Sequence, residues 1–318
     1  IVDSFQWYLN YLGPMAETQR WLTDLIETRE LDLEQRAMVR VSQAALANFG
    51  GNYGFTTTVA EDALQAARQL GEPRRLNAAL IMRGTTATFE GNAERAAECF
   101  VESAELSEKL GDLGGIAASM VFWGVAHRRL GDFAEAKRCF DEAFDGFTRL
   151  GDDRGLALVI GNLGRMAHQQ GDLARAEDLT RRGLEVAERS LDPMVTAQCG
   201  LFCGHAQLDL GNTKQSLEDF EVTLHWSLLL GNRTMSSAAL EWMVMVGGAE
   251  PEHVAVIDAF TELRRNAPGT ASPRLEWDQA VIDARAALSA DTHAALSVRG
   301  AAMTLDEAIA YARAAARG

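Results

Sequence analysis

Glycine recurs every twenty residues along most of this chain, and that interval limits what the chain can fold into. The series is Gly51, Gly71, Gly91, Gly111, Gly131, Gly151 and Gly171, then, after an interruption at Leu191, Gly211 and Gly231. The stretches between these marks carry apolar residues at three- and four-residue spacing, which is the pattern of an amphipathic helix. Glycine suits the left-handed position that ends a helix, and the Asp or Asn that usually follows it here can cap the next one. The sequence therefore predicts a helix, a tight turn and another helix, many times over.

The underlying repeat is forty residues long, because alternate helices differ. A second glycine series falls in the middle of every other predicted helix, at Gly84, Gly124, Gly164 and Gly204. Small residues follow twelve positions later and mostly large ones sixteen positions later, namely Ala96, Ala136, Ala176 and Ser216, then Phe100, Phe140, Thr180 and Phe220. A glycine inside a helix costs roughly 1 kcal/mol relative to alanine. We therefore expect a neighbouring helix to approach closely at each of these glycines.

This order of glycine, small residue and aromatic resembles the signature of the tetratricopeptide repeat (TPR). The best copy is formed by Trp123, Gly124, Ala136, Phe140 and Ala143. Because the period is forty residues, the chain resembles the long-helix variant of the repeat, over about residues 13–248. The resemblance implies an all-α fold, an α-solenoid in which antiparallel helix pairs stack into a right-handed superhelix.

The regular pattern divides the chain into two expected domains. Residues 1–250 are predicted to form a TPR-like array of about six helix pairs, of which the first is truncated and supplies only the helix at 18–30. After residue 250 the twenty-residue interval is lost, and a loop rich in Pro, Gly and Ser is expected at 266–274. Because a repeat array needs a terminal unit to cover its last apolar face, residues 251–318 are predicted to be an irregular helical cap.

The charge and the cysteine content of the chain limit its environment and its partners. The formal net charge is −15 and the isoelectric point is about 4.9. Such an acidic surface repels phosphate backbones, which argues against direct binding of nucleic acid or of an anionic membrane. The four cysteines form no disulfide framework and suit a reducing compartment. We expect a cytoplasmic chain.

The C-terminal segment RGAAMTLDEAIAYARAAA, residues 299–316, carries a second resemblance. It is similar to the segment that closes the TPR regions of large actinobacterial regulators, the STAND ATPases with LuxR-type or SARP-type DNA-binding domains. That resemblance implies an ATPase module upstream of the array. The chain also begins without Met and directly in an apolar-rich segment, which we interpret as a piece of a longer polypeptide.

The sequence shows little sign of catalysis. No phosphate-binding loop of the G-x-x-x-x-G-K-[ST] type occurs, and no G-x-S-x-G nucleophile motif. Cys199, Cys203 and His205 are the best candidates for a zinc site, but no fourth ligand is apparent, and buried cysteines usually pack as small apolar residues. We predict no enzyme activity, no metal and no cofactor.

The TPR resemblance implies that the first helix of each pair lines a concave groove. Its register places there Met82, Phe122, Asn162, Phe202 and Trp242, together with Arg128, Arg165, His168 and His205. An alternative interpretation is that the large apolar members pack as core between neighbouring helices. TPR proteins that hold chaperone C-termini use a Lys–Asn–Arg carboxylate clamp. Here the corresponding positions hold Ile81, Val121, Gly161 and Leu201, and only Asn162 and Arg165 are clamp-like. A peptide, a protein segment or a mid-sized apolar effector is therefore the expected ligand.

These observations lead to one preferred function and two alternatives. We predict a sensor and scaffold array of a multidomain transcriptional regulator, in which an effector in the concave groove shifts the balance between two states of the array. The first alternative is a constitutive protein–protein adaptor without a switching role. The second is an enzyme that uses zinc at Cys199 and Cys203.

Overall fold

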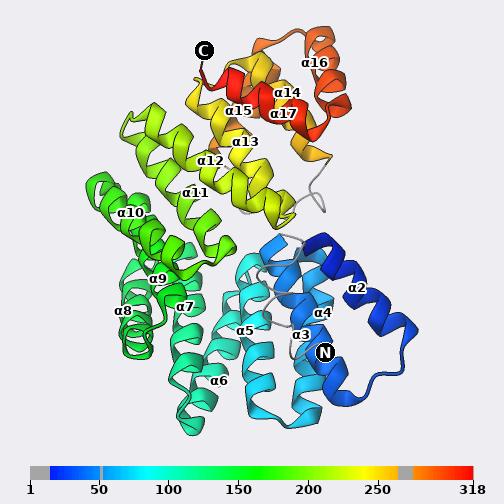
Figure 1. Ribbon diagram of the computed structural model, residues 1–318, viewed down its shortest axis with the longest axis vertical. Coiled ribbons are helices and arrows are strands. Elements are labelled where there is room, and N and C mark those ends of the chain that lie inside the picture. Colours follow the sequence, from blue (N-terminus) through cyan, green and yellow to red (C-terminus); the bar gives the residue numbers. More distant parts are fainter. Residues whose placement is uncertain (1–14, 51–52, 264–274, 318) are drawn as a thin grey trace.

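The glycine-marked intervals of the sequence are helices in a computed structural model of the chain. The structure describes residues 15–50, 53–263 and 275–317, and within these ranges it contains sixteen α-helices and no strand (Figure 1). The helices are α2 (Met15–Thr28), α3 (Leu33–Gly50), α4 (Tyr53–Leu70), α5 (Pro73–Glu90), α6 (Ala93–Leu110), α7 (Leu113–Arg129), α8 (Phe133–Leu150), α9 (Asp153–Gln169), α10 (Leu173–Ser190), α11 (Pro193–Asp209), α12 (Thr213–Leu229), α13 (Arg233–Val246), α14 (Pro251–Glu262), α15 (Leu275–Ala287), α16 (Ala290–Ala302) and α17 (Leu305–Ala315). None of these described helices is long and apolar enough to cross a membrane.

The turns follow the predicted stop and start. Gly111 ends α6 with a φ of 63°, and the side chain of the next residue, Asp112, accepts a hydrogen bond from the backbone N–H of Gly115 in α7. The same arrangement persists where the glycine is missing, since Leu191 ends α10 with a φ of 55°. A non-glycine residue in the left-handed region costs on the order of 1 kcal/mol, so packing on both sides of this turn outweighs the local preference.

The glycines inside alternate helices are sites of close approach, as predicted. A Cβ atom placed on Gly124 of α7 would lie 2.6 Å from the ring of Phe140 in α8, and one on Gly204 of α11 would lie 2.4 Å from the ring of Phe220 in α12. The glycines that recur every forty residues thus mark where each first helix packs against the second helix of its own pair.

The array also makes one contact between distant repeats. Leu22, Val39 and Leu46 of α2 and α3 share a buried apolar cluster with Met194 and Leu230, which lie at the start of α11 and the end of α12. We call these five residues the closing cluster. Helix α3 also contacts α13 directly, and Figure 1 shows the blue N-terminal helices beside the lower end of α12. A plain solenoid has contacts between neighbouring repeats only, and the closing cluster is an exception to this rule in the present array.

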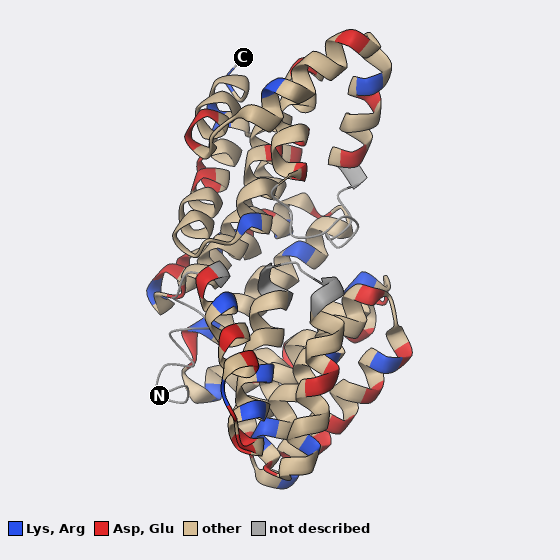
Figure 2. Cartoon of the chain, turned by 90° about the vertical axis from the view of Figure 1, so that its right-hand side faces the viewer, with Lys and Arg blue, Asp and Glu red and all other residues tan. Residues whose placement is uncertain are grey.

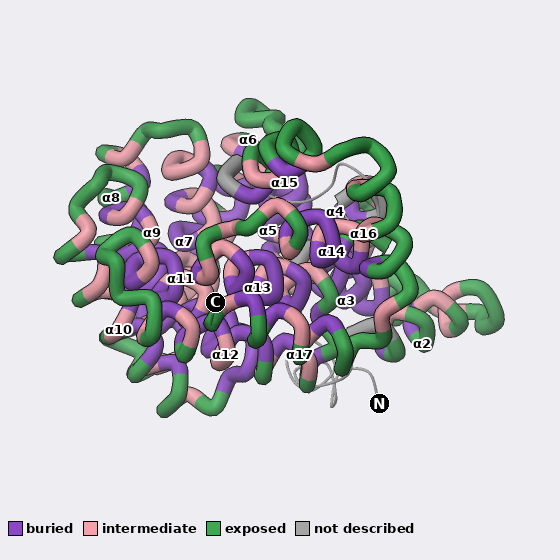
Figure 3. The backbone as a smooth tube through the Cα atoms, turned by 90° about the horizontal axis from the view of Figure 1, so that it is seen from above, coloured by how far each residue is buried: buried purple, intermediate pink, exposed green. Residues whose placement is uncertain are grey.

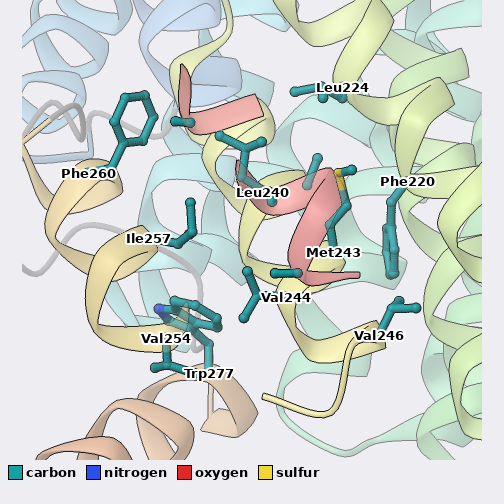
Figure 4. Close-up of a cluster of buried hydrophobic side chains, with 14 of the residues drawn as sticks. Phe220, Leu224, Leu240, Met243, Val244, Val246, Val254, Ile257, Phe260 and Trp277 are labelled. Carbon is teal, nitrogen blue, oxygen red and sulfur yellow. The ribbon is translucent and has the colours of Figure 1, made fainter. Parts of the chain in front are cut away.

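The C-terminal helices cover the last helix of the array. Phe260 of α14, Trp277 of α15 and Ala312 of α17 are all buried in one cluster with Leu240 and Met243 of α13 (Figure 4). A capping box stands at the start of α17, with Thr304 and Glu307 as its members. Residues of α14, α15 and α17 thus pack on the last helix of the array, while a helical cap at 251–318 and a domain boundary at residue 250 stay predictions. The predicted loop at 266–274 and the first fourteen residues lie outside the described residues.

Burial and charge follow this arrangement. In Figure 3 the buried stretches gather where helices face one another, while the turns and much of α2 and α16 are exposed. Acidic and basic residues are interspersed over both ends of the molecule (Figure 2). Ion pairs such as Arg68–Glu102 and Lys137–Asp141 account for part of this mixture.

Candidate functional site

The predicted groove residues all lie on successive first helices of the array. One of the nine residues lies on α5, two lie on α7, three on α9, two on α11 and one on α13. We call the nine residues the first-helix face: Met82, Phe122, Arg128, Asn162, Arg165, His168, Phe202, His205 and Trp242. Whether this face binds a ligand stays a prediction, and the structure shows how its side chains are held.

Three hydrogen bonds join one first helix to the next across this face. Arg128 Nη1 of α7 donates to Gln169 Oε1 of α9 at 2.7 Å. Arg165 Nη1 of α9 donates to His205 Nδ1 of α11 at 2.6 Å. His168 Nε2 of α9 bonds Asp209 Oδ2 of α11 at 2.8 Å. Hydrogen bonds across the polar part of the first-helix face therefore link α7 to α9 and α9 to α11.

His205 is the centre of an aromatic group at one end of this system. Its ring centroid lies 4.3 Å from that of Trp242 and 5.7 Å from that of Phe220, and the guanidinium of Arg165 lies 5.8 Å from the ring centre of Phe202. Burial, and then the charge of Arg165 and the proximity of His168, hold the pKa of His205 well below its usual range. The imidazole is thus neutral. Since Nδ1 accepts from Arg165, Nε2 carries the proton, and this buried Nε2 has no hydrogen-bond partner among the described residues.

Arg128 is the second unusual group on the face. Burial lowers its pKa to about 9, and the positive charges of Arg165 and Arg129 add to this effect. Its Nε is sealed from solvent and has no hydrogen-bond partner in the described chain. A guanidinium keeps its charge in proteins, so this arginine is a cation with incomplete compensation.

The remaining members of the face contribute mainly to packing. Asn162 is buried and its Nδ2 donates to the carbonyl oxygen of Leu158 in the same helix at 2.8 Å. Met82 and Phe122 are half-buried and pack against the apolar clusters between neighbouring repeats. The packing of Met82 and Phe122 agrees with the alternative interpretation of the large apolar side chains as core.

Comparisons with known proteins show which known fold this chain shares. Residues 115–189 match the family model of the tetratricopeptide repeat. The solved structure of NprR in complex with its cognate peptide NprX superposes with a TM-score of 0.62 over 98% of this chain and 84% of that one, at 11% identity. The fold is a TPR-like helical solenoid. No curated protein matches the sequence.

Two further solved structures share the TPR-like fold. A Rap protein complexed with Competence and Sporulation Factor gives a TM-score of 0.52 at 16% identity, covering 70% of this chain and 66% of that chain. The STAND protein PH0952 from Pyrococcus horikoshii, which has a tetratricopeptide repeat sensor, gives 0.53 at 13% identity. This chain covers 95% of its own length in that comparison but only 44% of the STAND protein. At these identities the likeness is one of fold.

The structure adds two residues to the site that the TPR register had not singled out. Gln169 and Asp209 are the partners of Arg128 and His168, and each stands five residues after the repeat glycine of its helix. Arg128 and His168 stand four residues after theirs. The residue four positions after the glycine of one repeat therefore bonds the residue five positions after the glycine of the next repeat. The two residues are forty-one apart in the sequence, and only the packing of the TPR-like array shows that they meet.

The cysteines behave as packing residues. All four are buried and unpaired. Burial raises the pKa of Cys139 to about 11 and that of Cys203 to about 12, and Cys199 Sγ lies 3.7 Å from the carbonyl oxygen of Ala157. His205 is directed to Arg165 instead of to the thiols. In the described part of the chain no group of three or more His, Cys, Asp or Glu side chains could hold a metal ion, so the zinc alternative has no support from the geometry.

Two hollows lie away from the first-helix face. One, of about 190 Å³, lies between α3 and α4 and is lined by Leu33, Arg36, Arg40, Asp62, Gln65, Ala66 and Gln69. The other, of about 560 Å³, is an open depression at the turn between α11 and α12. Neither is lined by a residue of the first-helix face, and neither contains a catalytic arrangement.

Proposed function

We propose that this chain is the ligand-binding sensor array of a larger regulatory protein and binds a peptide or protein segment along α7 to α13. The observation that carries the proposal is the pair of unsatisfied donors on the first-helix face, Arg128 Nε and His205 Nε2. A buried polar group without a partner costs about 1 to 3 kcal/mol. Because both atoms are sealed from solvent, a ligand reaches them only when the face opens, and the acceptors that it supplies in that state offset this cost.

The aromatic side chains beside these donors suit the same kind of ligand. Phe202 and Trp242 offer apolar surface within reach of Arg165 and His205. A peptide combines apolar side chains with regularly spaced carbonyl acceptors, and so matches both parts of the face. A mid-sized apolar effector uses the aromatic part alone.

The comparisons support this proposal at the level of fold. NprR is solved with its cognate peptide and the Rap protein with Competence and Sporulation Factor. The STAND protein combines an ATPase with a TPR sensor, which supports the proposal of an ATPase module ahead of the array. The finer proposal is that the whole protein is a cytoplasmic transcriptional regulator. In this scheme the array has no catalytic role, and the ligand favours one of two states for which it has different affinities.

The closing cluster favours a second candidate, a constitutive protein–protein adaptor. By joining α2 and α3 to the end of α12, it holds the curvature of the array with buried apolar contacts. An array held in this way binds its partner without changing shape.

Native mass spectrometry tests the proposal. The chain is purified gently from a lysate of its own organism, and the expected result is a non-covalent added mass that is lost on denaturation and in Phe202→Ala and Trp242→Ala. Trp226→Ala, which removes a half-buried tryptophan from the second helix α12, serves as the control and should retain it. Equal loss in all three variants would contradict binding at the first-helix face.

Small-angle X-ray scattering then separates the sensor from the adaptor. The radius of gyration is compared between the chain with and without the ligand identified above. A change on binding supports the sensor, and an unchanged profile supports the adaptor.

A further inference from the structure

The first helices of the array form a closed ring. Each packs against the next in the order α3, α5, α7, α9, α11 and α13, and α13 packs back against α3. Within the described residues, successive second helices lie farther apart and are linked by long side chains, as in Arg68–Glu102 between α4 and α6 and Arg181–Asp219 between α10 and α12. Helices that lie closer together are on the inner side of a curved array. The first helices therefore form the inner wall of this ring.

The donors on which the proposed function rests are sealed while the ring is closed. Arg128 Nε and His205 Nε2 are hidden from solvent and have no hydrogen-bond partner among the described residues. The bonds that link α7 to α9 and α9 to α11 across the same wall are between 2.6 and 2.8 Å long. When a curved array straightens, its inner helices separate more than its outer ones. Straightening thus lengthens these bonds first and lets water or a ligand reach the donors.

The ring straightens only if the closing cluster separates, because this cluster joins its two ends. The contact is small. From α11 and α12 it takes two buried side chains, Met194 and Leu230. The neighbours in sequence of Leu22 and Leu230, namely Trp21 and Leu229, are 41% and 59% exposed. Parts of a chain that meet over a limited apolar area move relative to one another, so this contact is suited to open while the repeats stay folded.

A buried amide beside the closing cluster weakens the closed state. Gln19 lies one turn before Leu22 on the same face of α2. Its Oε1 and Nε2 are both sealed from solvent without a hydrogen-bond partner in the described chain. A buried polar group of this kind costs free energy, and the cost is recovered once water reaches the group. Closure thus balances apolar contact against an unsatisfied amide.

We propose that the closing cluster is a clasp, whose opening widens the ring of first helices and admits the ligand to Arg128 and His205. This inference rests on the proposed function, because it names what controls access to the same face. A ligand held on the widened wall opposes closure, so ligand binding and clasp opening favour each other. The clasp is then the two-state element that a sensor requires, whereas the adaptor requires a clasp that stays closed.

Modification by diethyl pyrocarbonate measures this opening without any ligand. The reagent modifies neutral imidazoles that it can reach, so the rate at His205, read by peptide mapping, reports access to the inner wall. His225 is exposed on α12 and is the internal reference. The rates are compared at neutral pH in the wild type, Leu22→Ala and Leu64→Ala. Leu64 is the matched control, a similarly buried leucine of α4 in a cluster formed by α3 to α6.

We expect the rate at His205, relative to His225, to rise at least tenfold in Leu22→Ala and less than threefold in Leu64→Ala. Truncation of a buried leucine changes an equilibrium constant by more than tenfold, and only the first variant directs that change to the clasp. Met194→Ala weakens the clasp from its other side and should also raise the rate. It carries the test if circular dichroism shows that α2 unfolds in Leu22→Ala. The double variant should react far more slowly than the product of the two single effects predicts, because both side chains act through one contact.

The outcomes that overturn the clasp are distinct from those that overturn the proposed function. An unchanged rate at His205 in Leu22→Ala and Met194→Ala, or an equal rise in Leu22→Ala and Leu64→Ala, shows that the wall is exposed by another route. Ligand binding along α7 to α13 is then still tested by native mass spectrometry of Phe202→Ala. A rate at His205 in the wild type that equals the rate at His225 overturns the clasp and also contradicts the sealing of the donors on which the proposed function rests.

Discussion

Arg165 and His205, forty residues apart in the sequence, meet with 2.6 Å between Nη1 and Nδ1. Both stand one residue after the repeat glycine, so the contact joins the same position in successive repeats. It also adds to the effect of burial on the histidine, since burial first and then the cation bonded to Nδ1 lower the pKa of the ring. The repeat geometry thus sets both the position and the charge of the group at the centre of the first-helix face.

His205 should make the stability of the chain depend on pH. Its pKa in the folded chain lies well below the usual value near 6.5, so as the pH falls through 6.5 the unfolded chain takes up a proton that the folded chain excludes. This contribution is absent above pH 7, and between pH 7 and pH 5 it should lower the free energy of unfolding, by at most about 2 kcal/mol. Urea unfolding of wild type and His205→Gln at both pH values measures it. Parallel losses in the two proteins would show that His205 is not the source.

Gly124→Ala should destabilise the chain although alanine is the better helix former. The new Cβ meets the ring of Phe140 at 2.6 Å, and overpacking of this kind costs about 1 to 3 kcal/mol, more than the gain of roughly 1 kcal/mol in helix propensity. Gly114→Ala is the matched control in the same helix, because its Cβ would meet nothing closer than 3.5 Å. Urea unfolding should show a net loss for the first and no loss for the second. The register argument would fail if the two variants were equally stable.

Asp219→Ala should remove one of the strongest polar links between second helices. Asp219 is buried in α12 and accepts two bonds of 2.9 Å from Arg181 of α10. Loss of one partner of a buried pair costs about 3 kcal/mol, because the other charge stays behind. Asp178→Ala, which breaks an exposed pair with Arg182 at 3.5 Å, should cost less than about 0.5 kcal/mol. Thermal unfolding of both variants gives the comparison, and similar midpoints would contradict it.

The closing cluster should set the overall dimensions of the array. Leu46→Asp places a charge among buried apolar residues of α3, Met194 and Leu230, where an unpaired carboxylate is strongly unfavourable. We expect a larger radius of gyration in X-ray scattering with little change in helix content by circular dichroism. Leu130→Asp, at an exposed leucine in a turn, should leave both unchanged. Unchanged dimensions in Leu46→Asp would mean that the repeats fix the curvature without this contact.

The four cysteines should be unreactive in the folded chain. They are buried, and the raised pKa values of Cys139, about 11, and Cys203, about 12, keep the thiols protonated. Titration with Ellman's reagent at pH 8 should detect four thiols in urea and react much more slowly without it. A thiol that reacts in the folded chain at the rate of a free cysteine would contradict the burial of that side chain.

Local pattern was sufficient to predict the helices, their turns and their pairing. The interval of twenty residues predicts the length of the helices. Gly111 and Asp112 predict the end of α6 and the start of α7, and the spacing of Gly124 and Phe140 predicts the close approach of α7 and α8. Each of these features depends on residues within one helix pair, where the spacing along the chain and the spacing in space are directly related. The two resemblances went further than the pattern: the TPR-like fold is confirmed, and the regulator with LuxR-type or SARP-type domains stays a prediction.

The sequence by itself thus determined an all-α array of paired helices and the face on which the candidate site lies. Only the tertiary structure decided which members of that face are unsatisfied, because Arg128, Gln169, Arg165 and His205 are related by the rotation between repeats and not by helix periodicity. It likewise decided that α2 and α3 meet the end of α12. The curvature that brings them together is the sum of small angles between successive pairs, and each angle depends on the fit of buried side chains, which no repeat spacing encodes.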